Sequence, residues 1–413
     1  MWTESKAEHV EPTRLDKRAV AVLSLGHLVN DAYSSTIYPL LPLLAAQLRL
    51  SEVQVFFLVP TLSLTAAFLQ PLYGFISDRY SRRMFAVLGP AVTGIFMSLI
   101  GVASSYWLLL LCLFFGGIGG GAFHPQAASL VSQSGGERRR VAVSIFTSAG
   151  TLGVAIGPLM IAYVVGDNDL SKTVSIIGFG VIISLFLYLY CPPMKQSPGD
   201  RPKTGFDLSF LTNAGARGPL IVLYAVSLSR ASLHLLIANF LPFILRDQGY
   251  SLQATGGAMS AFLLAGALGS FLGGALAERF GERKLNALSG LLTTVFICFG
   301  LFLPGILGLT LFLLGTASLM SVIAVNVTQA QELAPSHTST VSAMLMGFVW
   351  GVGSLSVPLI GPFAATWGFR PVLLVMAVGP LLTGLWALKL RESRTTRRAR
   401  VDDVSVVVSA GAD

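Results

Sequence analysis

The chain consists largely of long apolar segments joined by short polar connections. A helix needs about 20 apolar residues to cross the hydrocarbon core of a bilayer. By this measure the sequence predicts twelve membrane-spanning helices, at 19–48, 52–77, 84–103, 107–133, 141–166, 173–191, 217–247, 252–277, 284–303, 306–333, 338–366 and 369–390. Only 12% of the 413 residues are charged, about half the fraction usual in soluble domains. Lipid must therefore cover much of the surface.

The longest polar stretch between apolar segments divides the chain near its middle. We predict a cytoplasmic N-terminal segment (1–18), a six-helix bundle (19–191), a cytoplasmic central loop (192–216), a second six-helix bundle (217–390) and a disordered cytoplasmic tail (391–413). We expect no cleaved signal peptide, because the first 18 residues are polar and the first apolar run is long. The three cysteines are expected to be buried free thiols.

Lysine and arginine residues predict the orientation in the membrane, because they are in excess on the cytoplasmic side. With the N-terminus inside, the inner segments hold 23 of them and the outer loops hold 4, while Arg230 lies within a span. Both termini are therefore predicted to be cytoplasmic. The alternative interpretation of the net charge of +8 is nucleic-acid binding. The charges lie in separate short loops, so we predict no nucleic-acid partner.

The sequence repeats itself at an offset of 200 residues. Residues 74–83 and 274–283 both read Gly-x-x-x-acid-Arg-aromatic-small-x-Arg, and each connects two apolar segments. The same offset matches Pro42 with Pro242, Ser51 with Ser251 and Pro158 with Pro358. This register indicates a duplicated six-helix unit, and it favours a two-bundle transporter with a path between the halves.

This architecture and the two loops resemble the major facilitator superfamily. Within it, the chain resembles the fosmidomycin-resistance group of efflux proteins at residues 26–31 (GHLVND), 123–125 (FHP) and 330–335 (AQELAP). The resemblance implies an all-α membrane protein with twelve transmembrane helices in two six-helix bundles related by a pseudo-two-fold. It also implies transport of a small molecule by alternating access.

Asp31 lies deeper within a predicted span than any other acidic residue. A charged group in the bilayer normally faces a cavity, pairs with another group or takes up a proton. We therefore predict a proton-coupling carboxylate, with a structural partner for a buried cation as the alternative. His27 and Tyr38 share a helix face with Asp31. His27 and His124 are the candidate proton carriers, although a membrane histidine is as often a hydrogen-bonded core residue.

Arg230 and His234 lie one helical turn apart in the seventh span, and the repeat aligns them with Asn30 and Ser34. We predict that Arg230 and Asp31 both face a central cavity. A guanidinium group suits a phosphonate or carboxylate substrate, and its alternative role is to neutralise Asp31. The other predicted cavity-lining residues are His234, Asn30, Tyr38, Gln126, Asn239 and Asn326. The resembling group commonly has Glu at the position of Gln126, which cannot titrate.

The repeated loops predict a cytoplasmic gate. Asp78 and Glu278 can accept hydrogen bonds at the N-termini of helices eleven and five, where carboxylates are stabilised. The resemblance implies that such contacts close the cytoplasmic side, whereas positive-inside anchoring is the simpler role for the arginines. The predicted gate comprises Gly74, Asp78, Arg79, Arg82, Arg83, Gly274, Glu278, Arg279, Arg283, Gln331 and Glu332. For Glu332, a solvated helix end is the alternative.

Gly153, Gly157 and Pro158 in the fifth span resemble the antiporter motif of drug/proton exchangers. The last glycine of that motif is missing, since Ile161 and Ala162 stand there. Small residues four apart are also common where membrane helices pack, so helix packing is the alternative interpretation.

The sequence lacks the Gly-Lys-Ser/Thr phosphate loop, HExxH and GxSxG, which argues against ATP coupling and an enzyme. We predict no cofactor and no metal, with a proton gradient as the energy source. The leading prediction is a monomeric proton-coupled exporter in a bacterial cytoplasmic membrane, acting on a small drug-like or anionic molecule. The alternatives are a symporter or facilitator that imports a small organic anion and, more distantly, a receptor or membrane enzyme.

Overall fold

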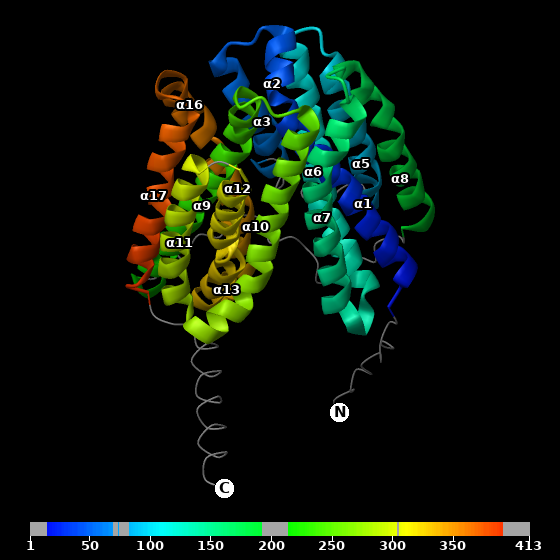
Figure 1. The fold of residues 1–413 in the computed structure, drawn as a ribbon. Coiled ribbons are helices and arrows are strands. Elements are labelled where there is room, and N and C mark those ends of the chain that lie inside the picture. Colours follow the sequence, from blue (N-terminus) through cyan, green and yellow to red (C-terminus); the bar gives the residue numbers. More distant parts are fainter. Residues whose placement is uncertain (1–14, 69–72, 74–81, 192–213, 304, 391–413) are drawn as a thin grey trace, which may run out of the picture.

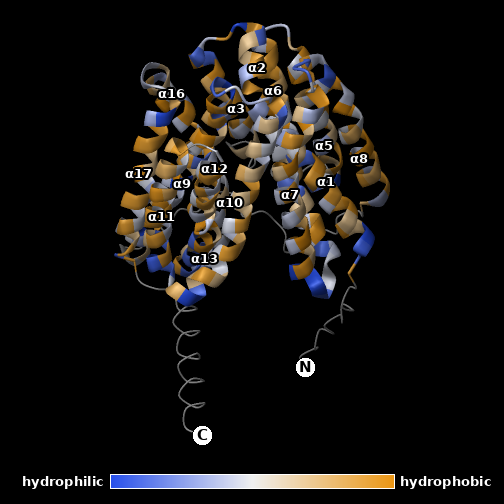
Figure 2. Ribbon diagram, viewed as in Figure 1, coloured by the Kyte–Doolittle hydropathy of each residue, from blue (hydrophilic) through white to orange (hydrophobic). Residues whose placement is uncertain are grey.

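The computed structural model describes residues 15–68, 73, 82–191, 214–303 and 305–390. The regular structure of these residues is helical throughout. Ten of their helical segments are long and apolar enough to cross a membrane, and Glu52–Ala67 is a shorter apolar helix. Figure 2 shows apolar residues along the lengths of the helices and hydrophilic residues mainly near their ends. The predicted all-α membrane fold is confirmed.

The first half of the chain forms the helices α1 to α8. Their bounds are Lys17–Ser35 (α1), Ile37–Leu48 (α2), Glu52–Phe68 (α3), Arg82–Leu99 (α5), Tyr106–Ser134 (α6), Arg139–Val165 (α7) and Ile177–Tyr190 (α8). The helices α1, α5, α6, α7 and α8 pack against one another, and α3 packs against α6. They form the N-terminal bundle.

The second half forms the helices α9 to α17. Their bounds are Ala214–Asp247 (α9), Leu252–Phe280 (α10), Glu282–Phe302 (α11), Gly305–Met320 (α12), Ile323–Leu333 (α13), Thr338–Ala343 (α14), Val349–Ser354 (α15), Ser356–Trp367 (α16) and Phe369–Ala387 (α17). A π-helical turn, Met344–Phe348, joins α14 to α15. These helices form the C-terminal bundle. Residues 192–213 lie outside the described part, so the predicted domain boundaries remain predictions.

The two bundles meet at one end of the molecule and diverge toward the other. Figure 1 shows them joined near α2 and apart at the end where α1 begins and α17 ends. The contacts between bundles pair α7 with α10, α2 with α9, and α3 with α15 and α16. We call this region of contact the seam.

Backbone carbonyls and small residues hold the seam together. Arg246 Nη1 donates to Pro42 O at 2.7 Å, and Gln253 Nε2 donates to Gly166 O at 3.1 Å. The close approach of α7 and α10 depends on Gly256, since a Cβ there would lie 2.7 Å from the carbonyl oxygen of Pro158.

The first predicted span, 19–48, is divided in two at Thr36. Pro39 lacks the N–H group that would bond to the carbonyl of Ser35, so one backbone hydrogen bond of a continuous helix is missing here. The Thr36 hydroxyl instead donates to Tyr33 O at 2.7 Å. The residues before and after the break therefore belong to two helices, α1 and α2.

The tenth predicted span, 306–333, is also discontinuous, because Ser321 and Val322 separate α12 from α13. The break lies against α10, where a Cβ on Gly273 would come within 1.6 Å of the Ser321 carbonyl oxygen. The last carbonyls of α12 have no partner further along the helix and must find one elsewhere.

Candidate functional site

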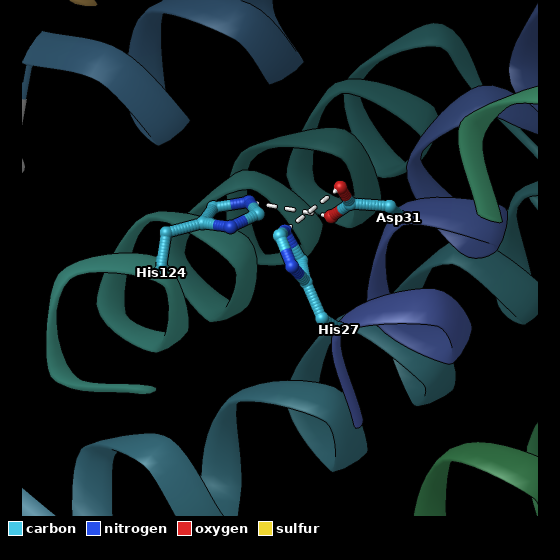
Figure 3. A group of neighbouring side chains, drawn as sticks. All are labelled: His27, Asp31 and His124. Carbon is cyan, nitrogen blue, oxygen red and sulfur yellow. Dashed lines mark ion pairs between the residues drawn. The ribbon is translucent and has the colours of Figure 1, made fainter. Parts of the chain in front are cut away.

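The structure brings together the three residues predicted to carry protons (Figure 3). His27 and Asp31 lie one turn apart on α1, with His27 Nε2 3.2 Å from Asp31 Oδ2. His124 reaches the same carboxylate from α6, with Nε2 3.4 Å from Oδ1. We call these residues the acid–base cluster. The side chain of Asp31 is 13% exposed and that of His124 is 34% exposed, so His124 is the accessible member.

The orientation of His27 is set by α7. Its Nδ1 lies 2.8 Å from the carbonyl oxygen of Phe146, and its ring stacks on the Phe146 ring at 4.1 Å. Gly150 leaves the necessary space, since a Cβ there would lie 2.4 Å from the imidazole. A carbonyl can only accept, so the hydrogen-bond network assigns a hydrogen to Nδ1.

This assignment has a consequence for the contact between His27 and Asp31. In a neutral ring with hydrogen on Nδ1, Nε2 is an acceptor, and an ionised carboxylate is also an acceptor. Two acceptors at 3.2 Å would repel each other. The contact therefore requires one more proton, carried either by Nε2 or by the carboxyl group.

The side-chain atoms of the acid–base cluster that could bind a metal ion lie within 4.8 Å of one another, close enough for one ion to contact all three residues. A shared proton satisfies the contact between His27 and Asp31 without an ion. The absence of a metal therefore remains a prediction.

Arg230 does not lie where we predicted. Its side chain is 0% exposed. Its guanidinium donates to Leu319 O at 3.0 Å, Asn286 O at 3.0 Å and Ser289 Oγ at 2.9 Å. No ion pair joins it to an acidic residue in the described part of the chain. Arg230 therefore points into the C-terminal bundle, not toward a cavity shared with Asp31.

The acceptors of Arg230 explain this orientation. Leu319 is near the end of α12, where the helix dipole places partial negative charge and the carbonyls need partners. Asn286 also donates to Asn326 Oδ1 at 2.9 Å, and Asn326 is fully buried. Asn326, predicted to line the cavity, thus belongs to the hydrogen-bond network that connects α9, α11 and α13.

His234 is buried on α9 between two aromatic residues. Its ring stacks on Phe262 at 4.7 Å and meets Trp350 edge-on at 5.5 Å. Its Nδ1 is buried and has no hydrogen-bond partner. We call His234, Phe262 and Trp350 the aromatic group.

The other predicted cavity residues have different surroundings. Asn30 Nδ2 donates to Asp31 Oδ1 at 3.2 Å and so supports the acid–base cluster. Asn239 Nδ2 donates to Leu235 O in its own helix, and Gln126 is buried on α6. Tyr38 packs against apolar residues of both bundles at the seam.

Several predicted gate residues, Gly74, Asp78 and Arg79, lie outside the described residues, as does the side chain of Arg82. Arg83 caps the end of α8, where its guanidinium donates to the carbonyls of Tyr188 and Cys191.

Glu278 and Arg279, two described gate residues of the second loop, lie in the last turn of α10. Glu278 is exposed, and no hydrogen bond joins it to the first turn of α7 among the described residues. Arg279 lies over the ring of Phe280, 5.6 Å from its centroid. Gly274 has open space around it, and Gln331 donates to Ser342 at 2.7 Å. Arg283 and Glu332 lie at helix ends on the same side. The bundles diverge here.

The antiporter-like residues of α7 have two roles in packing. A Cβ on Gly153 or Gly157 would lie 2.1 Å from a carbonyl oxygen of α1, so both glycines allow α1 and α7 to pack closely. Pro158 instead faces Gly256 of the other bundle, and the next residue, Leu159, donates its N–H to Ser260 Oγ at 3.0 Å.

Sequence reasoning missed the residues that orient these groups. Phe146 acts through its carbonyl, for which a sequence carries no signal. Asn286 and Ser289 are polar residues three apart in an apolar segment, a pattern that could have indicated a buried network. Phe262 and Trp350 could not be paired with His234 without the tertiary structure.

Comparison with known proteins defines the family. The model of the Major Facilitator Superfamily matches residues 23–355 and, in a second match, residues 222–410. The chain belongs to this superfamily. The second match begins about 200 residues after the first, which agrees with the internal repeat. The Major Facilitator Superfamily consists of transporters and not of enzymes, so the chain is an integral membrane protein of a transporter family.

Curated relatives cover most of the chain. It is 27% identical over 387 residues to the fosmidomycin resistance protein of Escherichia coli, covering 91% of this chain and 93% of the relative. The identity and both coverages are the same for YfnC of Bacillus subtilis, described as an uncharacterized MFS-type transporter. It is 23% identical to the multidrug resistance protein MdtG of Escherichia coli, covering 94% and 97% of the two chains. The resemblance to the fosmidomycin-resistance group is confirmed.

Solved structures confirm the major facilitator fold. A bacterial homologue of the human lysosomal transporter Spinster, in an inward-facing and unoccupied conformation, aligns with a TM-score of 0.78 at 17% identity, covering 93% and 97% of the two chains. The D-xylose–proton symporter aligns with a TM-score of 0.70 at 16% identity, covering 90% and 97%.

Proposed function

We propose that the protein is a proton-coupled antiporter that exports a small drug-like molecule by alternating access. The observation that carries this proposal is the contact between His27 and Asp31. Its two facing atoms require a proton between them because Phe146 occupies the other nitrogen of His27. A buried site that must gain or lose a proton to rearrange can couple proton flow to a conformational change.

His124 provides the exchange route in this proposal. Its side chain is more exposed than those of His27 and Asp31 and contacts the second oxygen of the carboxylate. It can pass a proton to or from the pair without disturbing the bond to Phe146. Gln126, where the resembling group commonly has Glu, cannot take this part, which is why the acid–base cluster is assigned the proton step.

Export is supported by the relatives, since two of them are named for resistance to fosmidomycin and to multiple drugs. The distribution of Lys and Arg predicts that both termini lie in the cytoplasm. In that orientation the seam closes the outer side, and the bundles diverge toward the cytoplasm. The energy source is then the proton gradient across a bacterial cytoplasmic membrane.

The alternative of organic-anion import rested on Arg230. Since its guanidinium already donates to three internal acceptors, nothing in the described structure favours that alternative. Proton flux in the same direction as the substrate would nevertheless establish symport.

The experiment that tests the proposal uses Asp31→Asn in proteoliposomes. This variant should lose substrate exchange driven by a pH gradient and keep part of its substrate binding. Asp169→Asn is the matched control. Hydrogen bonds from Ser171 lower the pKa of Asp169, so this exposed carboxyl stays ionised near neutral pH and should not contribute to coupling. Normal proton-driven exchange by Asp31→Asn would refute the role of Asp31.

A further inference from the structure

We infer that the seam end of the C-terminal bundle binds a zwitterionic aminophospholipid, with its phosphate at Arg370, its ammonium group at Glu52 and Asp247, and an acyl chain between α10 and α12. The site is separate from the acid–base cluster, and the inference does not depend on the cargo or on proton coupling. It follows from two adjoining cavities and from the charged groups that line them.

The first cavity has a volume of about 710 Å³ and lies between α9, α10, α11 and α12. We call it the apolar cavity, because apolar side chains form most of its walls. Ala254, Ala258 and Ala261 line it from one face of α10. Phe302 and Ile306 also line it and are 68% and 79% exposed. The apolar cavity therefore opens to the surface that lipid covers, and an acyl chain can enter it from the bilayer.

The small residues of α10 have different roles along the helix. Small residues usually allow membrane helices to approach closely, and Gly269 and Gly273 do so. A Cβ on Gly269 would lie 2.0 Å from Ala317 O, and one on Gly273 would lie 1.6 Å from Ser321 O. Nearer the seam, the three alanines border the apolar cavity, and Gly305 has open space around it. At this end the small residues make room for a guest and not for a helix contact.

The second cavity has a volume of about 540 Å³ and is lined by charged residues. We call it the polar cavity. Ile244, Gln248 and Arg370 line both cavities, so the two adjoin. Glu52, the first residue of α3, and Asp247, the last residue of α9, line the polar cavity alone. Groups of both charges therefore lie beside the apolar cavity.

These charged groups are available to a ligand. Among the described residues, no hydrogen bond or ion pair engages the side chain of Arg370, Glu52 or Asp247. A guanidinium group suits a phosphate through two parallel hydrogen bonds. A primary ammonium group has three donors, and ionised carboxylates accept. Phosphatidylethanolamine carries a phosphate and a primary ammonium group side by side, so its headgroup matches the charges of the polar cavity.

The depth of the site also matches a lipid. Tyr250 lines the apolar cavity and is exposed, and tyrosine is enriched at the interface between membrane and water. Arg370 lies in the first turn of α17 and Asp247 in the last turn of α9. A phosphate at Arg370 would therefore lie at headgroup level, with the apolar cavity beside it for the acyl chain.

The test compares three phospholipids that share two oleoyl chains and differ in headgroup: phosphatidylethanolamine, phosphatidylcholine and phosphatidylglycerol. Their binding to the purified, delipidated full-length protein is measured by native mass spectrometry. Phosphatidylcholine has no N–H donor, and phosphatidylglycerol has no amine. We expect phosphatidylethanolamine to bind about tenfold more tightly than either, the effect of a hydrogen bond between charged groups. Equal binding of the three lipids would overturn the inference.

A soluble headgroup distinguishes a lipid from a small polar ligand. Phosphoethanolamine carries the same charges and leaves the apolar cavity unused. It should therefore bind roughly 100-fold more weakly than the lipid. Binding as tight as that of the lipid would overturn the assignment of a lipid to this site.

Variants separate the two parts of the headgroup. Arg370→Gln should weaken the binding of phosphatidylethanolamine and phosphatidylcholine alike, by about tenfold, because both carry the phosphate. Lys172→Gln is the matched control, since Lys172 is an exposed cation that lines neither cavity. The double variant Glu52→Gln and Asp247→Asn should bind the two lipids equally. A preference for phosphatidylethanolamine that survives the double variant would overturn the role of the carboxylates.

A further pair of variants tests the acyl chain. Ala258→Phe should fill part of the apolar cavity and weaken the binding of phosphatidylethanolamine roughly tenfold. Ala275→Phe, at an exposed position on the same helix, should leave it unchanged. Equal binding by the two variants, with both eluting as folded protein, would overturn the position of the chain.

The bound lipid would also connect the two bundles, because Glu52 belongs to α3 while Asp247 and Arg370 belong to α9 and α17. A ligand favours the conformation that it binds. In proteoliposomes, phosphatidylethanolamine should therefore slow the thiol labelling of Leu252→Cys, at the start of α10, by about threefold or more relative to phosphatidylcholine. Arg370→Gln should remove this difference. Equal labelling of Leu252→Cys in the two lipids would overturn the connection between the bundles and leave the proposed proton coupling intact.

Discussion

His27 and Asp31 are in contact, and a third residue, Phe146, determines which nitrogen of His27 faces the carboxylate. Nε2 of His27 is 3.2 Å from the carboxylate, and Nδ1 is held by the carbonyl of Phe146. The backbone of α7 thus determines which nitrogen of a side chain on α1 is available to the acid. Changes that move α7 against α1 should alter the proton occupancy of Asp31.

We expect Gly150→Ala to impair proton coupling without unfolding the protein. The added Cβ would lie 2.4 Å from the His27 ring, so the ring must turn and lose its contact with Phe146 or Asp31. Misplacement of about 1 Å can cost roughly 100-fold in rate, and we expect a 10- to 100-fold loss of pH-driven exchange in proteoliposomes. Gly178→Ala is the control, because nothing lies within 4 Å of its Cβ. Equal rates in the two variants would show that the orientation of His27 does not limit coupling.

Arg230→Lys should destabilise the protein and leave substrate affinity nearly unchanged. Lysine cannot reproduce the planar arrangement of donors that binds Leu319, Asn286 and Ser289. We expect the free energy of unfolding to fall by about 2–3 kcal/mol, the scale of one lost hydrogen bond to a charged group, measured by denaturant unfolding in detergent. A large rise in KM with unchanged stability would instead indicate that Arg230 binds the substrate.

Replacement of Gly256 should open the seam. A Cβ at this position would lie 2.5 Å from Ala162 and 2.7 Å from Pro158 O, and overpacking of this kind costs about 1–3 kcal/mol. Gly256→Val should therefore favour the conformation in which the seam is separated. The measurement is the rate at which a membrane-impermeant thiol reagent labels Leu252→Cys at the start of α10. Gly257→Val, whose nearest neighbour is 3.8 Å away, should label no faster than the parent.

The membrane orientation can be tested independently of transport. A green fluorescent protein fused after residue 413 should fluoresce, and an alkaline phosphatase fused there should be inactive, because the excess of Lys and Arg predicts a cytoplasmic C-terminus. The same fusions after residue 168, in a predicted outer loop, should give the opposite result. An active phosphatase at the C-terminus would show that the topology is the opposite of the predicted one and that the seam lies on the cytoplasmic side.

Much of the fold could be predicted because span length and the 200-residue repeat are properties of the sequence alone. The acid–base cluster could also be predicted from the sequence, since His27 and Asp31 are one turn apart on one helix. The predicted direction of the Arg230 side chain was wrong, because the repeat indicates the depth of the residue in the membrane but not its rotamer. The carbonyl of Leu319 becomes available through the break between α12 and α13, which no periodic pattern showed. The fifth-span glycines could be interpreted as packing or as a motif, and only the structure shows that they face α1.

The buried guanidinium of Arg230 has a consequence for the response of the protein to voltage. An arginine remains protonated in proteins, and no acidic residue in the described structure pairs with this one. A full elementary charge that crosses the membrane field changes its energy by about 2.3 kcal/mol per 100 mV. Any rocking of the C-terminal bundle that shifts Arg230 along the membrane normal moves a fraction of this charge. The membrane potential would then bias the two ends of the transport cycle unequally, even when the exchange of cargo and proton carries no net current.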